Sequence, residues 1–206
     1  DMGDFTYLLR WSNGLDLSDT WSGQLGLSAL FGPNATGEDG QTRIYGSDLV
    51  VKWRPLTAER GWPFVLFEAE GLYRDTHAAA FDGVVLDEND VPITVSLPAG
   101  DLDDWGLYVQ GLWGFLRGFA AGLRYEFAEG GGATSMAYGS AIAISEDPYR
   151  ARRQRLSPLL AWHPSEHSRL RLQHNFDQSD YAPHDDVHSL WLGVEFSLGA
   201  HPAHSY

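Results

Sequence analysis

Apolar and polar side chains alternate with a period of two residues along most of this chain. The clearest example runs from residue 168 to residue 177. One set of alternate positions holds Leu170, Leu172, His174 and Phe176, whereas the positions between them carry arginine, glutamine, asparagine and aspartate. Such alternation is typical of a β-strand whose two sides meet different surroundings.

The same pattern predicts nine strands in all. Their ranges are 5–12, 21–31, 45–54, 65–74, 105–116, 119–127, 152–162, 168–177 and 189–198. Aromatic residues gather near the ends of these strands, and the charged residues inside the strands share one set of alternate positions. Because nearly every strand alternates in this way, we expect an all-β fold, an antiparallel transmembrane β-barrel in which residues 1–206 form one domain.

The connections between the predicted strands support this fold. They are longer after the second, fourth, sixth and eighth strands than after the others, and the longest are 76–104, which is rich in aspartate, and 130–151. Outer-membrane barrels have long outer loops and short periplasmic turns in this alternating order, and bacterial single-chain barrels have an even number of strands. Since nine is odd, we expect about nine to ten strands here, as the C-terminal part of a larger barrel.

Composition narrows the possible functions. The formal net charge is -14, and the acidic residues lie mainly between the predicted strands. A nucleic-acid partner is therefore not expected, because a phosphate-binding surface needs clustered lysine and arginine. The chain has no cysteine, so it has no disulfide framework. It contains no apolar run near the ~20 residues that a transmembrane helix needs, and no signal peptide is recognised at Asp1.

Several stretches resemble a known family. They are Leu27–Asn34, Ile44–Leu49, Lys52–Pro55, Trp105–Tyr108, Trp162–His174 and the tail Gly199–His204. Together they resemble the C-terminal half of a family of bacterial outer-membrane porin-like proteins, often labelled zinc-regulated outer-membrane proteins or receptors and distantly similar to phosphate-selective porins. The resemblance implies a larger parent barrel in the outer membrane. The label "zinc-regulated" describes expression and makes no histidine a ligand.

Charged residues inside the predicted strands are the first candidate site. The lumen and selectivity candidates are Lys52, Arg54, Glu68, Glu70, Arg124, Glu126, Arg155, Arg169, Arg171 and Glu195, and Arg10, Asp48 and Arg74 share their face. An arginine or lysine facing lipid at mid-membrane would cost roughly 2–4 kcal/mol, so we expect this face to line the interior. These residues set the ion preference of a channel, or they brace its wall through arginine–carboxylate pairs. Arg155, Arg169 and Arg171 form the densest basic cluster and the first place to look for an anion-binding constriction.

Histidine and acidic residues between strands suggest a second candidate. His184, Asp185, Asp186 and His188 offer the imidazole and carboxylate ligands that suit zinc, and His201 and His204 form another grouping. In extended chain, His184 and His188 would lie roughly 13 Å apart, so they share a metal only if the loop folds back. Solvated loop histidines are the alternative. The acidic residues between 82 and 104 concentrate cations at a pore mouth, bind divalent ions that bridge lipopolysaccharide, or keep an outer loop in solution.

The sequence thus predicts a porin-like channel in the outer membrane of a Gram-negative bacterium. Small hydrophilic solutes or ions would diffuse through a polar, charged lumen, in contact with outer-membrane lipid and lipopolysaccharide, and association of several copies is open. No enzymatic activity, catalytic residue or cofactor is expected, apart from a possible zinc ion. The alternative function is a receptor or metal-capture protein that binds zinc through acidic, histidine-bearing outer loops. A barrel enzyme or a structural anchor ranks last.

Overall fold

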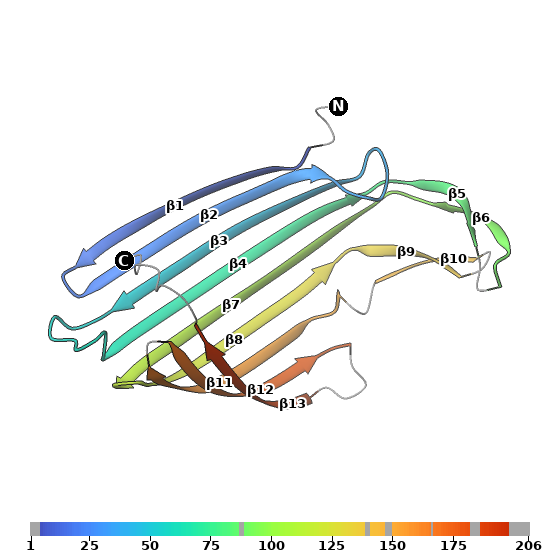
Figure 1. The fold of residues 1–206 in the computed structure, drawn as a ribbon. Coiled ribbons are helices and arrows are strands. Elements are labelled where there is room, and N and C mark those ends of the chain that lie inside the picture. Colours follow the sequence, from blue (N-terminus) through green and yellow to red (C-terminus); the bar gives the residue numbers. More distant parts are fainter. Residues whose placement is uncertain are drawn as a thin grey trace.

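A single antiparallel sheet of nine strands organises the molecule, as Figure 1 shows for the computed structural model. The structure describes residues 5–86, 89–138, 141–146, 150–165, 167–181 and 186–197. The strands of the sheet, in spatial order, are β1 (Tyr7–Ser18), β2 (Trp21–Pro33), β3 (Gln41–Trp53), β4 (Phe64–Ala78), β7 (Gly100–Leu116), β8 (Phe119–Gly131), β11 (Arg153–Ser165), β12 (Ser168–Ser179) and β13 (Asp186–Phe196). All nine predicted strands are confirmed, and most are longer than predicted.

Two further hairpins extend from one end of the sheet, on the right of Figure 1. They are β5 (Phe81–Leu86) with β6 (Pro92–Leu97), and β9 (Ala133–Tyr138) with β10 (Ala141–Glu146). The prediction that 76–104 and 130–151 are loops is therefore wrong for most of both intervals. Local pairing across a short turn satisfies the backbone groups of these segments despite their aspartate and proline residues.

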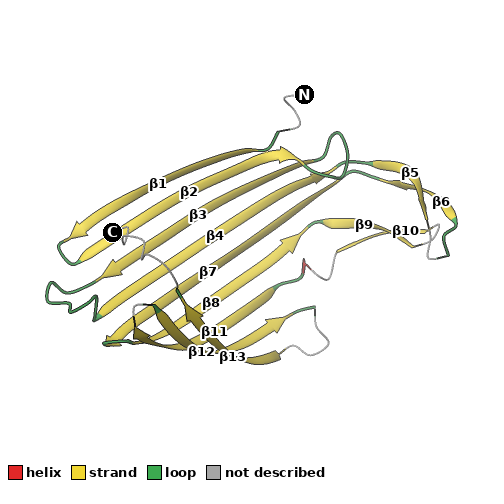
Figure 2. Cartoon of the chain, viewed as in Figure 1, coloured by secondary structure: helices red, strands yellow, loops and turns green. Residues whose placement is uncertain are grey.

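The opposite end of the sheet carries mostly tight turns, and we call it the turn end. Two residues connect β1 to β2, β7 to β8, and β11 to β12. The connection from β3 to β4, residues 54–63, is an exception. It is longer than the connection 34–40 between β2 and β3, which lies at the end of the sheet that carries the two hairpins and that we call the loop end. Figure 2 shows both kinds of connection in green. The predicted alternation of long and short connections is therefore wrong at this position.

The pairing register places like residues side by side. Directly opposed residues of antiparallel strands point to the same face. Leu49 of β3 is opposed by Leu25 on one side and by Ala69 on the other, and Ala69 is opposed by Val109 of β7. Asp48, one residue earlier, is opposed by Glu70. Each strand thus adds its apolar set to one side of the sheet, the apolar face, and its polar set to the other, the polar face. The predicted alternation of faces is confirmed.

Nothing in the described chain packs over the apolar face. Only four hydrophobic residues of the described part are buried, namely Val95, Ala120, Leu159 and Ala161. Even in the interior strands, apolar-face side chains are widely exposed, with Trp113 at 58%, Leu123 at 51% and Leu160 at 56%. The accessible surface is 14399 Å², against about 9,600 Å² for a compact monomer of 22.8 kDa. The described residues thus form one layer of sheet without a central core.

The sheet is open. Among the described residues, β1 pairs only with β2 and β13 pairs only with β12, so each has one unpaired edge. The described residues therefore do not close into a barrel by themselves. The expected antiparallel all-β sheet is confirmed, and its place in a larger barrel stays a prediction. No helix of the described part has the length and hydropathy needed to cross a bilayer.

Candidate functional site

The polar face of the sheet gathers almost all the predicted lumen residues. Register places Lys52, Glu68, Glu70, Arg124, Glu126, Arg155, Arg169, Arg171 and Glu195 on it, with Arg10, Asp48 and Arg74. Arg54 is different, because it follows the last residue of β3 and its backbone N–H donates to Thr20 O at 2.9 Å. The alternation in the sequence was sufficient to find this set.

Arginine–carboxylate pairs cross the polar face. Arg10 Nη1 of β1 lies 2.5 Å from Asp48 Oδ2 of β3, although β2 runs between them. Gly26 of β2 makes this possible, since a Cβ there would overlap both side chains. The pair therefore depends on a glycine at one position of the intervening strand.

The predicted basic cluster is largely neutralised. Arg155 is hydrogen-bonded to Asp177 through Nε, and its Nη1 lies 4.0 Å from Glu126 Oε2. Arg169 Nη2 lies 2.5 Å from Glu195 Oε2.

Arg171 differs from these two arginines. It donates to Gln173, and no carboxylate of the described residues pairs with it. Cross-strand pairing, the alternative considered for these residues, thus accounts for Arg155 and Arg169 but not for Arg171.

A second ion-pair network lies toward the loop end of the sheet. Asp104 of β7 accepts from Arg74 Nη2 of β4 at 2.6 Å, and its other oxygen lies 2.7 Å from Arg150 Nη2. Arg150 also donates to the backbone oxygen of Asp103 at 2.9 Å. The sequence analysis placed Asp104 in an acidic loop and did not single out Arg150. Only the pairing of β4 with β7 brings Asp104 opposite Arg74.

Neutral polar side chains form a row that the sequence analysis missed. Ser157, which is fully buried, donates to Asn175 Oδ1 at 2.8 Å, and Asn175, 4% exposed, donates to Ser189 at 3.1 Å. On the same face, Gln110 of β7 donates to Glu68 of β4 at 2.7 Å. These residues occupy polar positions of the alternation, and that was the available signal. Their mutual bonds satisfy the groups that burial removes from water.

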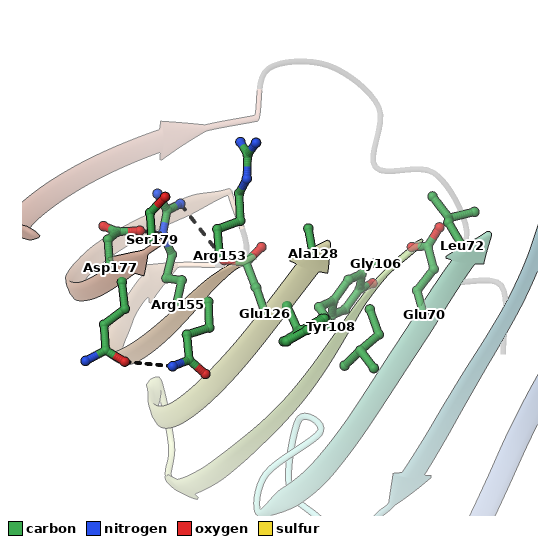
Figure 3. Close-up of a pocket in the computed structure, with 14 residues that line it drawn as sticks. Glu70, Leu72, Gly106, Tyr108, Glu126, Ala128, Arg153, Arg155, Asp177 and Ser179 are labelled. Atoms are coloured by element: carbon green, nitrogen blue, oxygen red, sulfur yellow. Dashed lines mark hydrogen bonds and ion pairs between the residues drawn. The ribbon is translucent and has the colours of Figure 1, made fainter. Parts of the chain in front are cut away.

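A hollow of about 530 Å³ opens on the polar face across β4, β7, β8, β11 and β12 (Figure 3). Glu70, Tyr108, Glu126, Arg155 and Asp177 contribute charged and phenolic groups to its lining. The guanidinium of Arg124 lies 4.0 Å from the centre of the Tyr108 ring, a cation–π contact. The hollow presents both signs of charge and can hydrogen-bond to small polar solutes.

The predicted zinc set stays a prediction, because the structure describes only two of its four residues. His184 and Asp185 lie outside the described residues, as do His201 and His204. Asp186 accepts from Gln178 Nε2 at 2.8 Å, and the His188 ring stacks on His174 at 5.5 Å between ring centres. No group of three or more histidine or acidic side chains within the described ranges is arranged to hold a metal ion.

Aromatic residues form two rows on the apolar face. One row lies near the turn end, where the ring centres of Trp21 and Trp53 are 6.4 Å apart and those of Phe119 and Trp162 are 6.1 Å apart. The other lies toward the loop end, with Tyr45 and Tyr73 at 6.4 Å and Trp105 and Phe127 at 4.5 Å. Aromatic rings thus bound the apolar face at both ends, and the tyrosines and tryptophans among them combine apolar area with a polar atom.

Comparison with protein-family models and with curated proteins finds no match to this chain.

Proposed function

We propose that this protein is a porin-like channel of a Gram-negative outer membrane, through which small hydrophilic solutes or ions diffuse along a polar, charged wall. The single observation that carries the proposal is the separation of the two faces. Nine adjacent strands turn their apolar side chains to one side, where nothing in the described chain covers them. Lipid is the surrounding that stabilises an uncovered apolar face of this extent, and membrane barrels alternate apolar-out and polar-in.

The dimensions of the apolar face agree with a bilayer. Tyr45 and Trp53 mark the two aromatic rows on β3. Their separation along the strand is about 26 Å at ~3.3 Å per residue. A strand tilt of about 40° reduces this to about 20 Å along the membrane normal, near the ~25 Å apolar band of outer-membrane barrels. The nine strands have 11–17 residues, and ~9–11 suffice to cross a bilayer.

The two edge strands of the open sheet, β1 and β13, run in the same direction. The nine strands alternate in direction, so β1 and β13 run the same way. An antiparallel closure therefore takes an odd number of further strands between them, which makes the total even, as in bacterial single-chain barrels. Closure is also needed because an open sheet edge in hydrocarbon leaves backbone groups without partners. We propose that further strands of the same barrel occupy both edges.

Planar-bilayer recording of the full-length protein in potassium chloride tests the proposal. We expect stepwise increases in current as single channels insert. Insertion is checked separately, by protection of the protein from protease in vesicles. A protein that inserts but leaves the membrane silent would overturn the channel function, and one that stays monodisperse in water without detergent would overturn the membrane location.

A further inference from the structure

The connection between β3 and β4, residues 54–63, is an ordered segment at the turn end, and we call it the inner loop. Glu59 and Trp62 exchange backbone hydrogen bonds of 2.9 and 3.1 Å. Arg60 and Gly61, the two residues between them, have φ angles of 51° and 84°, as the tightest hairpin turns require. The hydrogen bonds and the turn geometry therefore define the backbone conformation of the inner loop.

The end of the inner loop packs on the polar face of the sheet. Trp62 and Phe64 contact each other at 4.9 Å between ring centres. Both pack against the cluster formed by Ala120, Leu159 and Ala161. Within the described chain this is the one apolar cluster built around several buried residues. Its position is unexpected, because most of the charged and amide side chains of the sheet lie on this face.

Small residues create the space that the two rings fill. A Cβ at Gly114 of β7 would overlap the rings of both Phe64 and Trp62. The neighbouring position on β8 is Ala120, directly opposite Gly114. The rings thus lie in a depression lined by a glycine and alanines, which is complementary packing rather than casual contact.

The inner loop extends across the polar face from β4 to β11. Trp62 lies 5.8 Å from the His163 ring of β11, measured between ring centres. In the sheet, β11 is the third strand from β4. At ~4.8 Å between strands, the contact covers about 14 Å of the polar face.

We propose that the inner loop is a fixed constriction at the turn-end mouth of the channel, with Trp62 as the residue that sets the size of the solutes that pass. This inference depends on the proposed channel function. Hydrophobic and aromatic narrowings restrict passage through pores because they reduce the open cross-section and expose no strong ion ligands. The solutes favoured at this mouth are small hydrophilic molecules and hydrated ions, and larger oligomeric solutes are excluded.

The first test compares two tryptophans. Trp62→Ala removes the ring that covers the wall, and Trp113→Ala removes a 58%-exposed ring from the apolar face. We expect Trp62→Ala to raise single-channel conductance by roughly 1.5-fold or more, since conductance scales with the narrowest cross-section. It should also admit larger sugars in vesicle-swelling assays, whereas Trp113→Ala should conduct like the wild type.

A matched glycine pair tests the same idea without deleting a ring. Gly114→Val displaces Trp62 and Phe64 from their depression, whereas a Cβ at Gly111, on the apolar face of the same strand, meets nothing within 4 Å. We expect a larger conductance for Gly114→Val than for Gly111→Val.

The chain has no cysteine, so Arg60→Cys provides a single thiol, and a bulky thiol reagent bound there should reduce the current. Asp19→Cys in the β1–β2 turn is the control.

The outcomes separate the two proposals. If the wild type conducts but Trp62→Ala, Gly114→Val and the labelled Arg60→Cys protein all conduct like their controls, the inner loop is not a constriction and the channel stands. If the wild type inserts and is silent, the channel itself is overturned, and the constriction with it.

Discussion

The two faces of this sheet differ in how their side chains are packed and exposed. On the polar face, side chains contact one another across strands, as Arg10 does with Asp48 and Asn175 with Ser157 and Ser189. On the apolar face, large side chains such as Trp113 and Leu160 stay more than half exposed. The difference teaches that the two faces are stabilised in different ways. Polar side chains satisfy one another's hydrogen bonds across strands, whereas the apolar side chains have no partner within the described chain.

The inner loop sharpens this comparison because it breaks the rule locally. It brings Trp62 next to Phe64 of β4 on the polar face, and the two rings cover Leu159 and two alanines. Within the described chain, fully buried apolar side chains therefore occur only in small clusters on the polar face and in the hairpins, and not on the apolar face.

An arginine introduced on the apolar face should have the largest effect on the free energy of unfolding. Leu49 lies on the apolar face of β3, midway between the aromatic rows, and Val50 lies next to it on the polar face, opposite Glu68. We expect Leu49→Arg to lower the free energy of unfolding from lipid vesicles by about 2–4 kcal/mol, the cost of arginine at mid-membrane. Val50→Arg should cost less than about 1 kcal/mol, since its guanidinium meets water and a carboxylate. Urea titration in phosphatidylcholine vesicles measures both, and equal losses would contradict the assignment of the faces.

Breaking the buried polar row should have an intermediate effect. Asn175→Leu keeps the branched shape of the side chain but removes the acceptor of the buried Ser157 hydroxyl and the donor to Ser189, which still accepts from Trp191. We expect a loss of about 1–3 kcal/mol in the same titration, because buried polar groups left unpaired carry their full desolvation cost. Ser189→Ala removes only one of the bonds and should cost less. A neutral or stabilising Asn175→Leu variant would mean that water reaches this row.

Exposed ion pairs should contribute least to stability. Arg169 and Glu195 form a 2.5 Å pair, and their side chains are 40% and 61% exposed. We expect Arg169→Gln or Glu195→Gln to change unfolding by less than about 1 kcal/mol, because solvent screens such pairs.

The same two variants should act on selectivity with opposite sign. In a salt gradient, the reversal potential should move toward cation preference for Arg169→Gln and toward anion preference for Glu195→Gln. Identical potentials in the wild type and both variants would show that this pair braces the wall without acting on ions.

Periodicity was a good guide wherever a strand has two unlike sides. It predicted the nine sheet strands and assigned Leu49 and Glu68 to opposite faces, because both properties depend on neighbours along the chain. It failed for Phe81–Leu86 and Pro92–Leu97, which pair as β5 and β6. These segments are short and lie among aspartate and proline residues, so composition suggested a loop although cross-turn pairing was available.

The candidate site was predicted as a set of residues but not as a set of contacts. Arg155 and Arg169 were expected to form one basic cluster with Arg171, yet each is held by a carboxylate of a neighbouring strand. Arg150 and Asn175 were not singled out, because their roles depend on partners 46 and 18 residues away in sequence. Residue type indicated arginine–carboxylate pairing in general but not which residues would pair.

The sequence alone determined that this protein is a sheet with one apolar and one polar side, since a repeat of two residues needs nothing beyond the geometry of an extended backbone. The tertiary structure alone decided which charges neutralise each other and where the inner loop docks. Both depend on strand register and on the order of strands across the sheet, and a shift of one residue would move every side chain to the other face.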